Sequence, residues 1–430
     1  IISLYIVNSK TGKVVFDKNS QVGSAPASCM KVFTSAASLE MLGKSYRYKT
    51  VFGYDGNIDG NKLTGNIFIQ ASGDPSLGSW RWNGTRDEVI EQDLLKALAK
   101  KGINYISGNL IIDDSKWGTQ ATPNGWTWED MGNYYGAGAR GLNWHENQYD
   151  LNLKPGKNIG DPVEITGTVP ELQISILVNE LKTGKAGSGD HSIIYLPENG
   201  LIGFVRGTVP FGNNAFKISG SMPDPSNAFS KAINDVLIKN NISLLGSTKT
   251  ATTYFINKQK MPVATDTLFT YFSPTLDSIN YWFLQKSINL YGEAFVKTIA
   301  HEKMGFGETE KGIEIIKNFW TANGIEKSAL YMVDGSGLSP ANRVTTHALV
   351  TAMQYAKKQN WYPSFLNALP GQNGIKMKSG YISGVRSYTG YIKSKQGTEY
   401  TFAFIINNFD GDPGAVREKM WKLLDEVKNH

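Results

Sequence analysis

The sequence predicts a mixed α/β (α+β) fold in which both ends of the chain build one domain around an inserted, strand-rich middle. The chain starts with a hairpin and a helix, and it ends with consecutive strands followed by a helix. Between about Tyr48 and Thr267 the pattern changes to short strands, turns and many glycines, and helices return after it. Because the two ends share this mixture of hairpin, helices and strands while the middle differs, we expect the middle to be an insertion. The sequence shows no internal repeat and no low-complexity tract.

The first elements are a hairpin and a core-facing helix. Residues 4–8 and 14–17 are short apolar runs joined by a polar, glycine-containing turn at 9–12, which is a hairpin signal. Residues 28–42 carry apolar side chains at helical spacing, and Gly43 follows them as a stop signal.

The remaining elements are predicted from apolar periodicity. Residues 150–220 are strand-rich and contain many glycines. We expect further strands at 51–54, 65–70, 108–113, 247–253, 376–380, 387–393 and 400–407, and helices at 88–101, 228–239, 276–283, 290–301, 312–320, 347–358 and 415–427.

Composition limits the class of protein. A chain of 430 residues holds two or three domains at a prior of ~100–200 residues each. A hydrophobic fraction of 40% and a charged fraction of 19% exclude a disordered chain. The net charge of +6 is spread without a long Lys/Arg block, so we expect no nucleic-acid partner. No run of ~20 apolar residues is present, and the single cysteine, Cys29, excludes an intramolecular disulfide.

Ser28 and Lys31 form an S-x-x-K pair at the start of the first predicted helix. Positions i and i+3 lie on one face of a helix, so the hydroxyl and the amine would share the same space. Serine is a poor nucleophile without a base, and lysine can be that base when burial or a neighbouring cation lowers its pKa. Taken alone, the spacing favours the ordinary interpretation of two residues on a solvated helix face. Pro26 before the pair and the apolar residues after it favour a buried helix.

Two distant runs have the composition of partners for this pair. Ser287-Ile288-Asn289 lies between two predicted helices, and Lys378-Ser379-Gly380 lies on a predicted strand near the C-terminus. Lys378 could lower the pKa of Lys31 and bind a substrate carboxylate, Asn289 could orient a substrate amide, and Ser287 could relay a proton to a leaving amine. Each run alone is an ordinary loop or strand segment, so the evidence lies in their joint occurrence and order.

With these motifs in this order, the sequence resembles the serine penicillin-recognising enzymes, whose motif set includes S-x-x-K, S-D-N and K-T-G. Ser28 and Ser287 are 259 residues apart, which points to a family with domains inserted between the first two motifs. This family is the low-molecular-mass class C penicillin-binding proteins, the D-alanyl-D-alanine carboxypeptidase/endopeptidase group known as peptidase family S13. Other runs similar to this family are 72–77, 126–147 and 334–339.

The resemblance implies a fold and a domain division. The catalytic part would be a penicillin-binding transpeptidase/β-lactamase-like domain with a five-stranded antiparallel sheet flanked by helices, built from residues 1–47 and 264–430. Inserted domain II would span 48–150 and 220–263, and inserted domain III would span 151–219.

The resemblance also implies an activity, that of a serine-type D-Ala-D-Ala carboxypeptidase, with DD-endopeptidase action left open. Ser28 would be acylated by a peptidoglycan stem peptide or by a β-lactam antibiotic, Lys31 would take its proton, and water would release the acyl-enzyme. The backbone N–H groups of Ser28 and Tyr381 would form the oxyanion hole. No cofactor is implied, and the five histidines show no spacing typical of a metal site. The residues expected to bind substrate are Ser379, Gly380, Tyr381, Asp130, Tyr135 and Arg343.

Several positions depart from the family pattern. Ile288 stands where Asp is common, and Ser379 replaces Thr but keeps the hydroxyl. Tyr381 is larger than the usual residue, and Pro340 takes the place of an arginine that often follows the 334–339 run, which leaves the side-chain preference open. Cys29, next to the nucleophile, is expected to be a small buried hydrophobic residue rather than a second nucleophile.

The implied substrate places the protein in the bacterial cell envelope, in a periplasmic or other extracytoplasmic location, although no signal peptide is visible. Peripheral membrane association and oligomeric state stay open. A β-lactamase or esterase on the same fold is one alternative, but no motif for a deacylating water is visible. A non-catalytic peptidoglycan-binding module is another, and the intact set Ser28, Lys31, Ser287, Asn289 and Lys378 argues against it.

Overall fold

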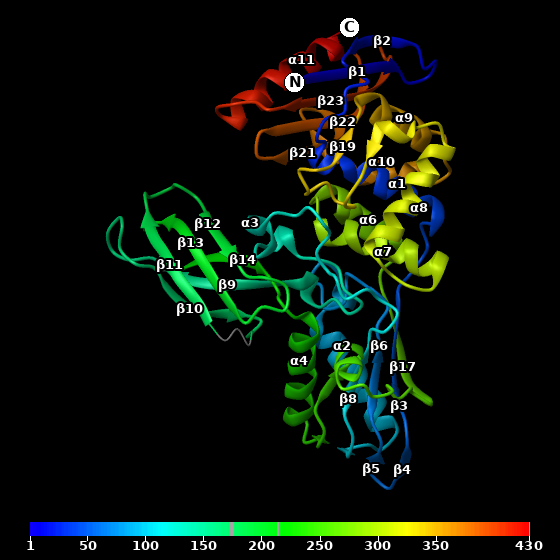
Figure 1. Ribbon diagram of the computed structural model, residues 1–430, viewed down its shortest axis with the longest axis vertical. Helices are drawn as coiled ribbons and strands as arrows, with labels where there is room; N and C mark the ends of the chain where they lie inside the picture. The colour runs from blue at the N-terminus through cyan, green and yellow to red at the C-terminus, as the bar shows by residue number, and fades with distance from the viewer. Residues whose placement is uncertain (173–175, 213–214, 430) are drawn as a thin grey trace. The chain divides into compact units, whose positions relative to one another are not determined.

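The computed structural model describes residues 1–172, 176–212 and 215–429, which divide into two compact units. Unit 1 contains residues 1–46, 123–126 and 275–430, and unit 2 contains residues 47–122 and 127–274. Figure 1 shows the chain coloured from its N-terminus to its C-terminus.

The centre of unit 1 is an antiparallel sheet made from both ends of the chain. β1 pairs with β23 along its whole length, from Ile2 opposite Ile406 to Asn8 opposite Tyr400. This pairing confirms that the first and last segments fold together. The strands in spatial order are β2 (Val14–Lys18), β1 (Ile2–Asn8), β23 (Glu399–Asn407), β22 (Val385–Lys393), β21 (Ile375–Ile382) and β20 (Gly371–Gln372).

The sheet has six strands, where five were predicted, because a two-residue strand precedes β21. β20 and β21 are joined by Asn373 and Gly374, whose φ angles are 48° and 69°. Two consecutive positive φ values are typical of a type I′ hairpin turn, which Asn-Gly strongly favours. This short hairpin signal was not used in the sequence prediction.

Helices cover both faces of the sheet (Figure 1). Met420 and Leu424 of α11 (Pro413–Asn429) pack with one face of the strands, including Leu4, Phe402 and Phe404. α9 (Thr346–Lys357) contacts the other face, where Tyr391 Oη donates a hydrogen bond of 2.7 Å to Met353 O. The other helices of unit 1 are α1 (Lys31–Met41), α6 (Leu276–Gln285), α7 (Asn289–Met304), α8 (Thr309–Ala322) and α10 (Tyr362–Ala368), and its short pair of strands is β18 (Leu330–Tyr331) with β19 (Arg343–Val344).

α1 is the central helix of unit 1. All its residues from Lys31 to Leu39 are buried, so its first residue carries an amine into the core. Ser28 precedes this helix in a 3-10 turn, η1 (Ala27–Met30), rather than lying in the α-helix that was predicted from residue 28. A 3-10 turn has three residues per turn, so the side chains at i and i+3 still lie one above the other.

Unit 2 is strand-rich, as predicted. One sheet has the order β16-β8-β6-β3-β17, a second has the order β15-β7-β5-β4, and α2 and α4 contribute to the same core through Leu94 and Phe229. The elements of these layers are β3 (Lys49–Tyr54), β4 (Asn57–Asp59), β5 (Lys62–Thr64), β6 (Ile67–Gln70), β7 (Tyr105–Ile106), β8 (Leu110–Asp113), β15 (Ser243–Leu244), β16 (Thr248–Thr250), β17 (Asp266–Phe272), α2 (Asp87–Lys100), α4 (Pro225–Lys239) and α5 (Ala251–Ile256). The short helix α3 (Trp128–Met131) instead contacts strand β12 (His191–Tyr195).

The described residues between 148 and 221 in unit 2 form two three-stranded sheets around their own core, which includes Leu151, Leu153 and Val205. An inserted domain at 151–219 needs a hydrophobic core of its own, and this cluster supplies one. The division of the chain into a catalytic domain and inserted domains II and III stays a prediction. The strands are β9 (Gln148–Lys154), β10 (Glu164–Val169), β11 (Ile176–Gly184), β12 (His191–Tyr195), β13 (Ile202–Pro210) and β14 (Phe216–Ser221).

Two details differ from the sequence prediction. β17 pairs with β3, so residues 266–272 lie in unit 2, although the catalytic domain was expected to resume at 264. The run 247–253 is a strand only over β16 and then turns into α5, because Thr250 caps the helix by accepting the Thr253 N–H. Within the described residues, no helix is both long and apolar enough to cross a membrane.

Candidate active site

The Ser28 hydroxyl lies at an opening in an otherwise buried segment. From Ser24 to Leu39 every residue is buried except Ser28, which is partly exposed. Ala27 holds a φ of 45°, a left-handed conformation that turns the chain sharply just before the serine. This strained entry presents one hydroxyl to solvent while its neighbours stay in the core.

The Lys31 amine contacts this hydroxyl and two further oxygen atoms. Lys31 Nζ lies 3.0 Å from Ser28 Oγ, 2.6 Å from Asn289 Oδ1 and 2.7 Å from the backbone oxygen of Ser336. Burial, followed by the nearby charge of Lys378, holds the pKa of this amine well below its usual range. Asp334 and Glu293 pull the pKa in the opposite direction and do not prevail.

The geometry around Lys31 suits a neutral amine. A neutral amine has two N–H groups and one lone pair, and the Asn289 amide oxygen and the Ser336 carbonyl oxygen can only accept hydrogen bonds. If each takes one N–H, the lone pair faces the Ser28 hydroxyl. The arrangement can therefore accept the Ser28 proton, which is the requirement for a general base.

Asn289 and Ser287 are placed by the turn between α6 and α7. Asn289 is the first residue of α7, and Ser287 lies two residues before it with a φ of 58°. A non-glycine residue in this region costs roughly 1–3 kcal/mol, and such residues concentrate at functional sites. The structure joins Asn289 to Lys31 directly, across 258 residues of sequence.

Lys378, Ser379 and Gly380 lie on β21, and the glycine sets the distance to the nucleophile. A Cβ added to Gly380 would come within 2.6 Å of Pro26 O and 2.8 Å of Ser28 N, which no real Cβ does. Glycine therefore lets β21 approach the turn that carries Ser28.

The two flanking side chains of this motif are held locally. The Lys378 amine is buried and donates to Ser379 O at 2.7 Å, and burial lowers its pKa to about 8. Gln372 Nε2 donates to Ser379 Oγ at 3.0 Å, a contact that sequence reasoning missed because Gln372 belongs to the unexpected strand β20.

Cys29 behaves as a buried residue. Its side chain is fully buried, Sγ lies 3.3 Å from Lys378 O, and burial raises the pKa of the thiol to about 11. A protonated, enclosed thiol is not a nucleophile at neutral pH. The expectation of a small hydrophobic residue is confirmed.

The other expected substrate-binding residues are not joined to Ser28 by a described contact. Tyr381 is 51% exposed and stacks under the Arg386 guanidinium, 4.7 Å from its ring centroid. Arg343 is exposed and donates to the carbonyl oxygens of Pro340 and Asn342, so its guanidinium holds its own turn. These two positions stay predictions.

Asp130 and Tyr135 belong to unit 2 and form their own small cluster there. Thr127 Oγ1 donates to Asp130 Oδ2 at 2.7 Å. Burial, and then the negative charge of Asp130, raises the pKa of Tyr135 above its usual range. Their part in substrate binding also stays a prediction.

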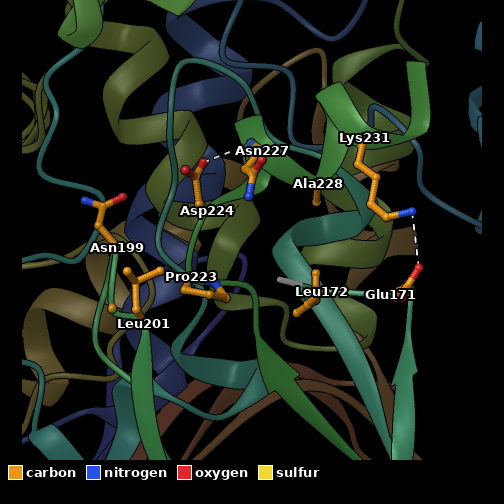
Figure 2. A pocket seen from close by; sticks show the side chains of 10 residues that line it. Glu171, Leu172, Asn199, Leu201, Pro223, Asp224, Asn227, Ala228 and Lys231 are labelled. Atoms are coloured by element: carbon orange, nitrogen blue, oxygen red, sulfur yellow. Dashed lines mark hydrogen bonds and ion pairs between the residues drawn. The ribbon is translucent and has the colours of Figure 1, made fainter. Parts of the chain in front are cut away.

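Unit 2 also contains a hollow of about 90 Å³ between the start of α4 and the loops near residues 171 and 200 (Figure 2). Its charged groups are already engaged: Lys231 pairs with Glu171 at 3.2 Å and with Asp235 at 2.8 Å, and Asp224 caps α4 by accepting the Asn227 N–H. It contains none of the predicted catalytic residues. Among the residues that the structure describes, no cluster of three or more His, Cys, Asp or Glu side chains could hold a metal ion.

An antiparallel sheet between helices, with a serine and a buried lysine at the start of the central helix, defines a protein of the serine penicillin-recognising class. The chain belongs to the D-Ala-D-Ala carboxypeptidase 3 (S13) family, whose model matches residues 1–427. The family resemblance stated from the motifs is thereby confirmed.

Characterised relatives cover almost the whole chain. The D-alanyl-D-alanine carboxypeptidase of Actinomadura sp. (strain R39) is 24% identical over 464 residues, which span 100% of this chain and 82% of the relative. The D-alanyl-D-alanine carboxypeptidase DacB of Haemophilus influenzae is 23% identical over 450 residues, spanning 98% of this chain and 88% of the relative.

Solved structures share the fold. Penicillin binding protein 4 (dacB) from Haemophilus influenzae superposes with a TM-score of 0.84 at 21% identity, covering 100% of this chain and 97% of that one. The same protein complexed with a β-lactam gives a TM-score of 0.78 at 20% identity, covering 100% and 96%. The predicted penicillin-binding fold is confirmed.

Proposed function

We propose that this chain is a serine-type D-Ala-D-Ala carboxypeptidase that cleaves peptidoglycan stem peptides through an acyl-Ser28 intermediate. The observation that carries the proposal is the Lys31 amine, fully buried and 3.0 Å from the Ser28 hydroxyl. Membership of the S13 family and relatives named D-alanyl-D-alanine carboxypeptidase support the reaction class.

In the acylation step, Lys31 takes the proton of Ser28 as Oγ attacks the carbonyl carbon of the penultimate D-Ala. The C–N bond to the terminal D-Ala then breaks, and the leaving amine needs a proton, which Ser287 relays. The backbone N–H groups of Ser28 and Tyr381 stabilise the oxyanion, as the close approach of Gly380 to Ser28 N supports. Water then hydrolyses the ester.

Substrate recognition uses the charge and hydrogen-bonding groups near the nucleophile. Lys378 in its charged form attracts the terminal carboxylate, and Asn289 orients the peptide amide. Ser379 presents a hydroxyl whose position Gln372 fixes. We propose that Asp130, Tyr135 and Arg343 take part in side-chain selection, which the family resemblance supports.

The substrate also implies a place of action. Peptidoglycan lies outside the bacterial cytoplasm, so we propose an extracytoplasmic site of action in the cell envelope. Family membership supports this assignment. We further propose that β-lactams acylate Ser28, since a related structure contains a bound β-lactam.

Labelling with a fluorescent penicillin tests the proposal. The wild-type protein should form a covalent adduct with the mass of the intact drug, and Ser28→Ala should form none. The wild type should also release D-Ala from a peptide ending in D-Ala-D-Ala. Labelling that survives the Ser28→Ala change would contradict the proposal, and rapid loss of the adduct with drug turnover would indicate a β-lactamase instead.

A further inference from the structure

Glu293 is a buried carboxyl group that the proposed mechanism does not use. It lies on α7, four residues after Asn289 and therefore on the same helix face. Its side chain is fully buried, and Oε2 accepts the Gly335 N–H at 3.0 Å. Oε1 has no partner of ordinary hydrogen-bond geometry among the described residues, and the Ser336 side chain is close enough to lower the pKa of this carboxyl group. A buried polar atom left in this state is costly and calls for an explanation.

Glu293 holds a peptide segment that continues to the Lys31 amine. Gly335 O accepts a hydrogen bond of 2.7 Å from Thr34 Oγ1 on α1, while the Gly335 N–H is taken by Glu293 on α7. The next carbonyl, Ser336 O, accepts from Lys31 Nζ at 2.7 Å. The direction of the Ser336 carbonyl is thus fixed by contacts on both sides of Gly335.

The approach of this segment to α7 is very close. A Cβ on Gly335 would lie 2.7 Å from Gly292 O and 2.5 Å from Val296 Cγ2. Only glycine lets the segment reach the Glu293 carboxyl. The sequence therefore contains two matched features, a buried acid on α7 and a glycine opposite it.

We propose that Glu293 is a positioning residue for the general base: it holds the Gly335–Ser336 segment so that the Ser336 carbonyl takes one N–H of Lys31 and leaves the amine lone pair facing Ser28. The proposal rests on the function proposed above. Glu293 contacts no reacting atom in it and acts only through the backbone of residues 335 and 336.

The role requires Glu293 to be uncharged in the resting enzyme. A carboxylate this close would stabilise the ammonium form of Lys31, which has no lone pair to offer. Burial, and then the negative charge of Asp334, raises the pKa of Glu293 well above its usual range, so the protonated form is favoured. The titratable groups around it are Asp334 from the adjoining turn, Lys31 from α1 and Lys297 one turn along α7.

Three variants separate positioning from charge. Glu293→Gln keeps an uncharged oxygen acceptor for the Gly335 N–H, whereas Glu293→Ala removes the acceptor. Glu40→Ala is the control, because Glu40 is also a carboxyl group in unit 1 and accepts the Trp361 Nε1–H at 2.7 Å. Neither Glu40 nor Trp361 is a hydrogen-bond partner of Lys31 or of Gly335 in the contacts described above. The readout is the second-order rate of acylation by fluorescent penicillin from about pH 6 to about pH 10.

At neutral pH we expect Glu293→Gln to acylate within about threefold of the wild type and Glu293→Ala to fall by about 30-fold or more, since misplacing a catalytic group by about 1 Å can cost ~10²-fold. In alkaline solution the ratio of Gln-variant to wild-type rate should rise, because only the wild type acquires a carboxylate there. Glu40→Ala should keep the wild-type pH profile.

Several results would overturn the inference. A Glu293→Gln variant that folds normally but whose acylation rate at neutral pH falls by more than about tenfold would show that a charged Glu293 is needed. An Ala variant with the wild-type rate would remove the positioning role. If the Ala variant does not fold, the Gln variant alone tests the proposal. Its acylation rate at neutral pH and the ratio of its rate to the wild-type rate in alkaline solution then decide the outcome. Absence of labelling in the wild type would instead overturn the proposed function itself, so the two failures differ.

Discussion

Replacing Gly380 with alanine tests how closely β21 must approach the nucleophile. The added Cβ would lie 2.4 Å from Ser387 Oγ, 2.6 Å from Pro26 O and 2.8 Å from Ser28 N. Two of these atoms are backbone atoms of the segment that carries the serine, so a side-chain rotation cannot relieve the overlap. β21 and the 26–28 segment must separate.

The distances around Gly380 give the expected size of two effects of this substitution, one on the free energy of unfolding and one on the rate of acylation. Ordinary van der Waals contact needs a separation of roughly 1 Å more than these distances, and overpacking of this kind costs about 1–3 kcal/mol. Alanine is favoured over glycine within a strand by about 0.5–1 kcal/mol, which offsets part of that cost. The free energy of unfolding should therefore fall by about 0–2.5 kcal/mol. A displacement of about 1 Å at the oxyanion-binding N–H groups should lower acylation by ~10²-fold.

The assay is the second-order rate of fluorescent penicillin labelling, measured with the free energy of unfolding from urea denaturation. Gly371→Ala is the matched control, because Gly371 lies in the same sheet and a Cβ there meets no atom within 4 Å. We expect the control to label at the wild-type rate. A Gly380→Ala protein that labels as fast as the control would refute the reasoning that links this glycine to the nucleophile.

Three further predictions concern the buried charged groups of unit 1. Burial lowers the pKa of Lys378 to about 8. The KM for a D-Ala-D-Ala peptide should therefore rise as the pH increases through that value, because the substrate carboxylate loses its charged partner. A KM that does not change with pH would argue against carboxylate binding by Lys378. The folded pKa lies below the unfolded one, so the unfolded chain binds more protons and the free energy of unfolding should rise with pH between the two. Asp334→Ala should lower the free energy of unfolding by about 3 kcal/mol or more, measured by urea denaturation. The substitution leaves four buried donors without their acceptor: Gly337 N, Ser339 N, Trp126 Nε1 and Asn342 Nδ2. A smaller loss would contradict this prediction.

Most regular elements could be predicted because their apolar periodicity is local. The helices at α7, α8 and α9 and the strands β21 to β23 lie within a few residues of their expected bounds. The missed elements include β17 (Asp266–Phe272), which lies where the helical pattern was expected to return, and two shorter elements. α10 spans only Tyr362–Ala368, which is too few residues for a helical pattern to be distinct, and β20 depends on a two-residue turn.

The candidate site was predicted in its residue types and in the proximity of Ser28 to Lys31, but not in its other contacts. Ser28, Lys31 and Asn289 were chosen by motif, and the structure brings these three together. The Ser336 carbonyl could not be chosen, because every residue has such a group and only the fold aims this one at Lys31. Glu293 had one available signal, its position four residues after Asn289, which was not used.

By itself, the sequence determined the chemistry of this protein: the S-x-x-K pair, its two partner motifs and the long insertion between them specify a family and a type of nucleophile. Only the tertiary structure decided the surroundings of the Lys31 amine, whose pKa burial holds well below its usual range. The side chain of Lys31 is buried, and its amine contacts three oxygen atoms, which belong to Ser28, Asn289 and Ser336. Both arise when α1, α7 and the 334–339 turn pack together, which no local pattern records.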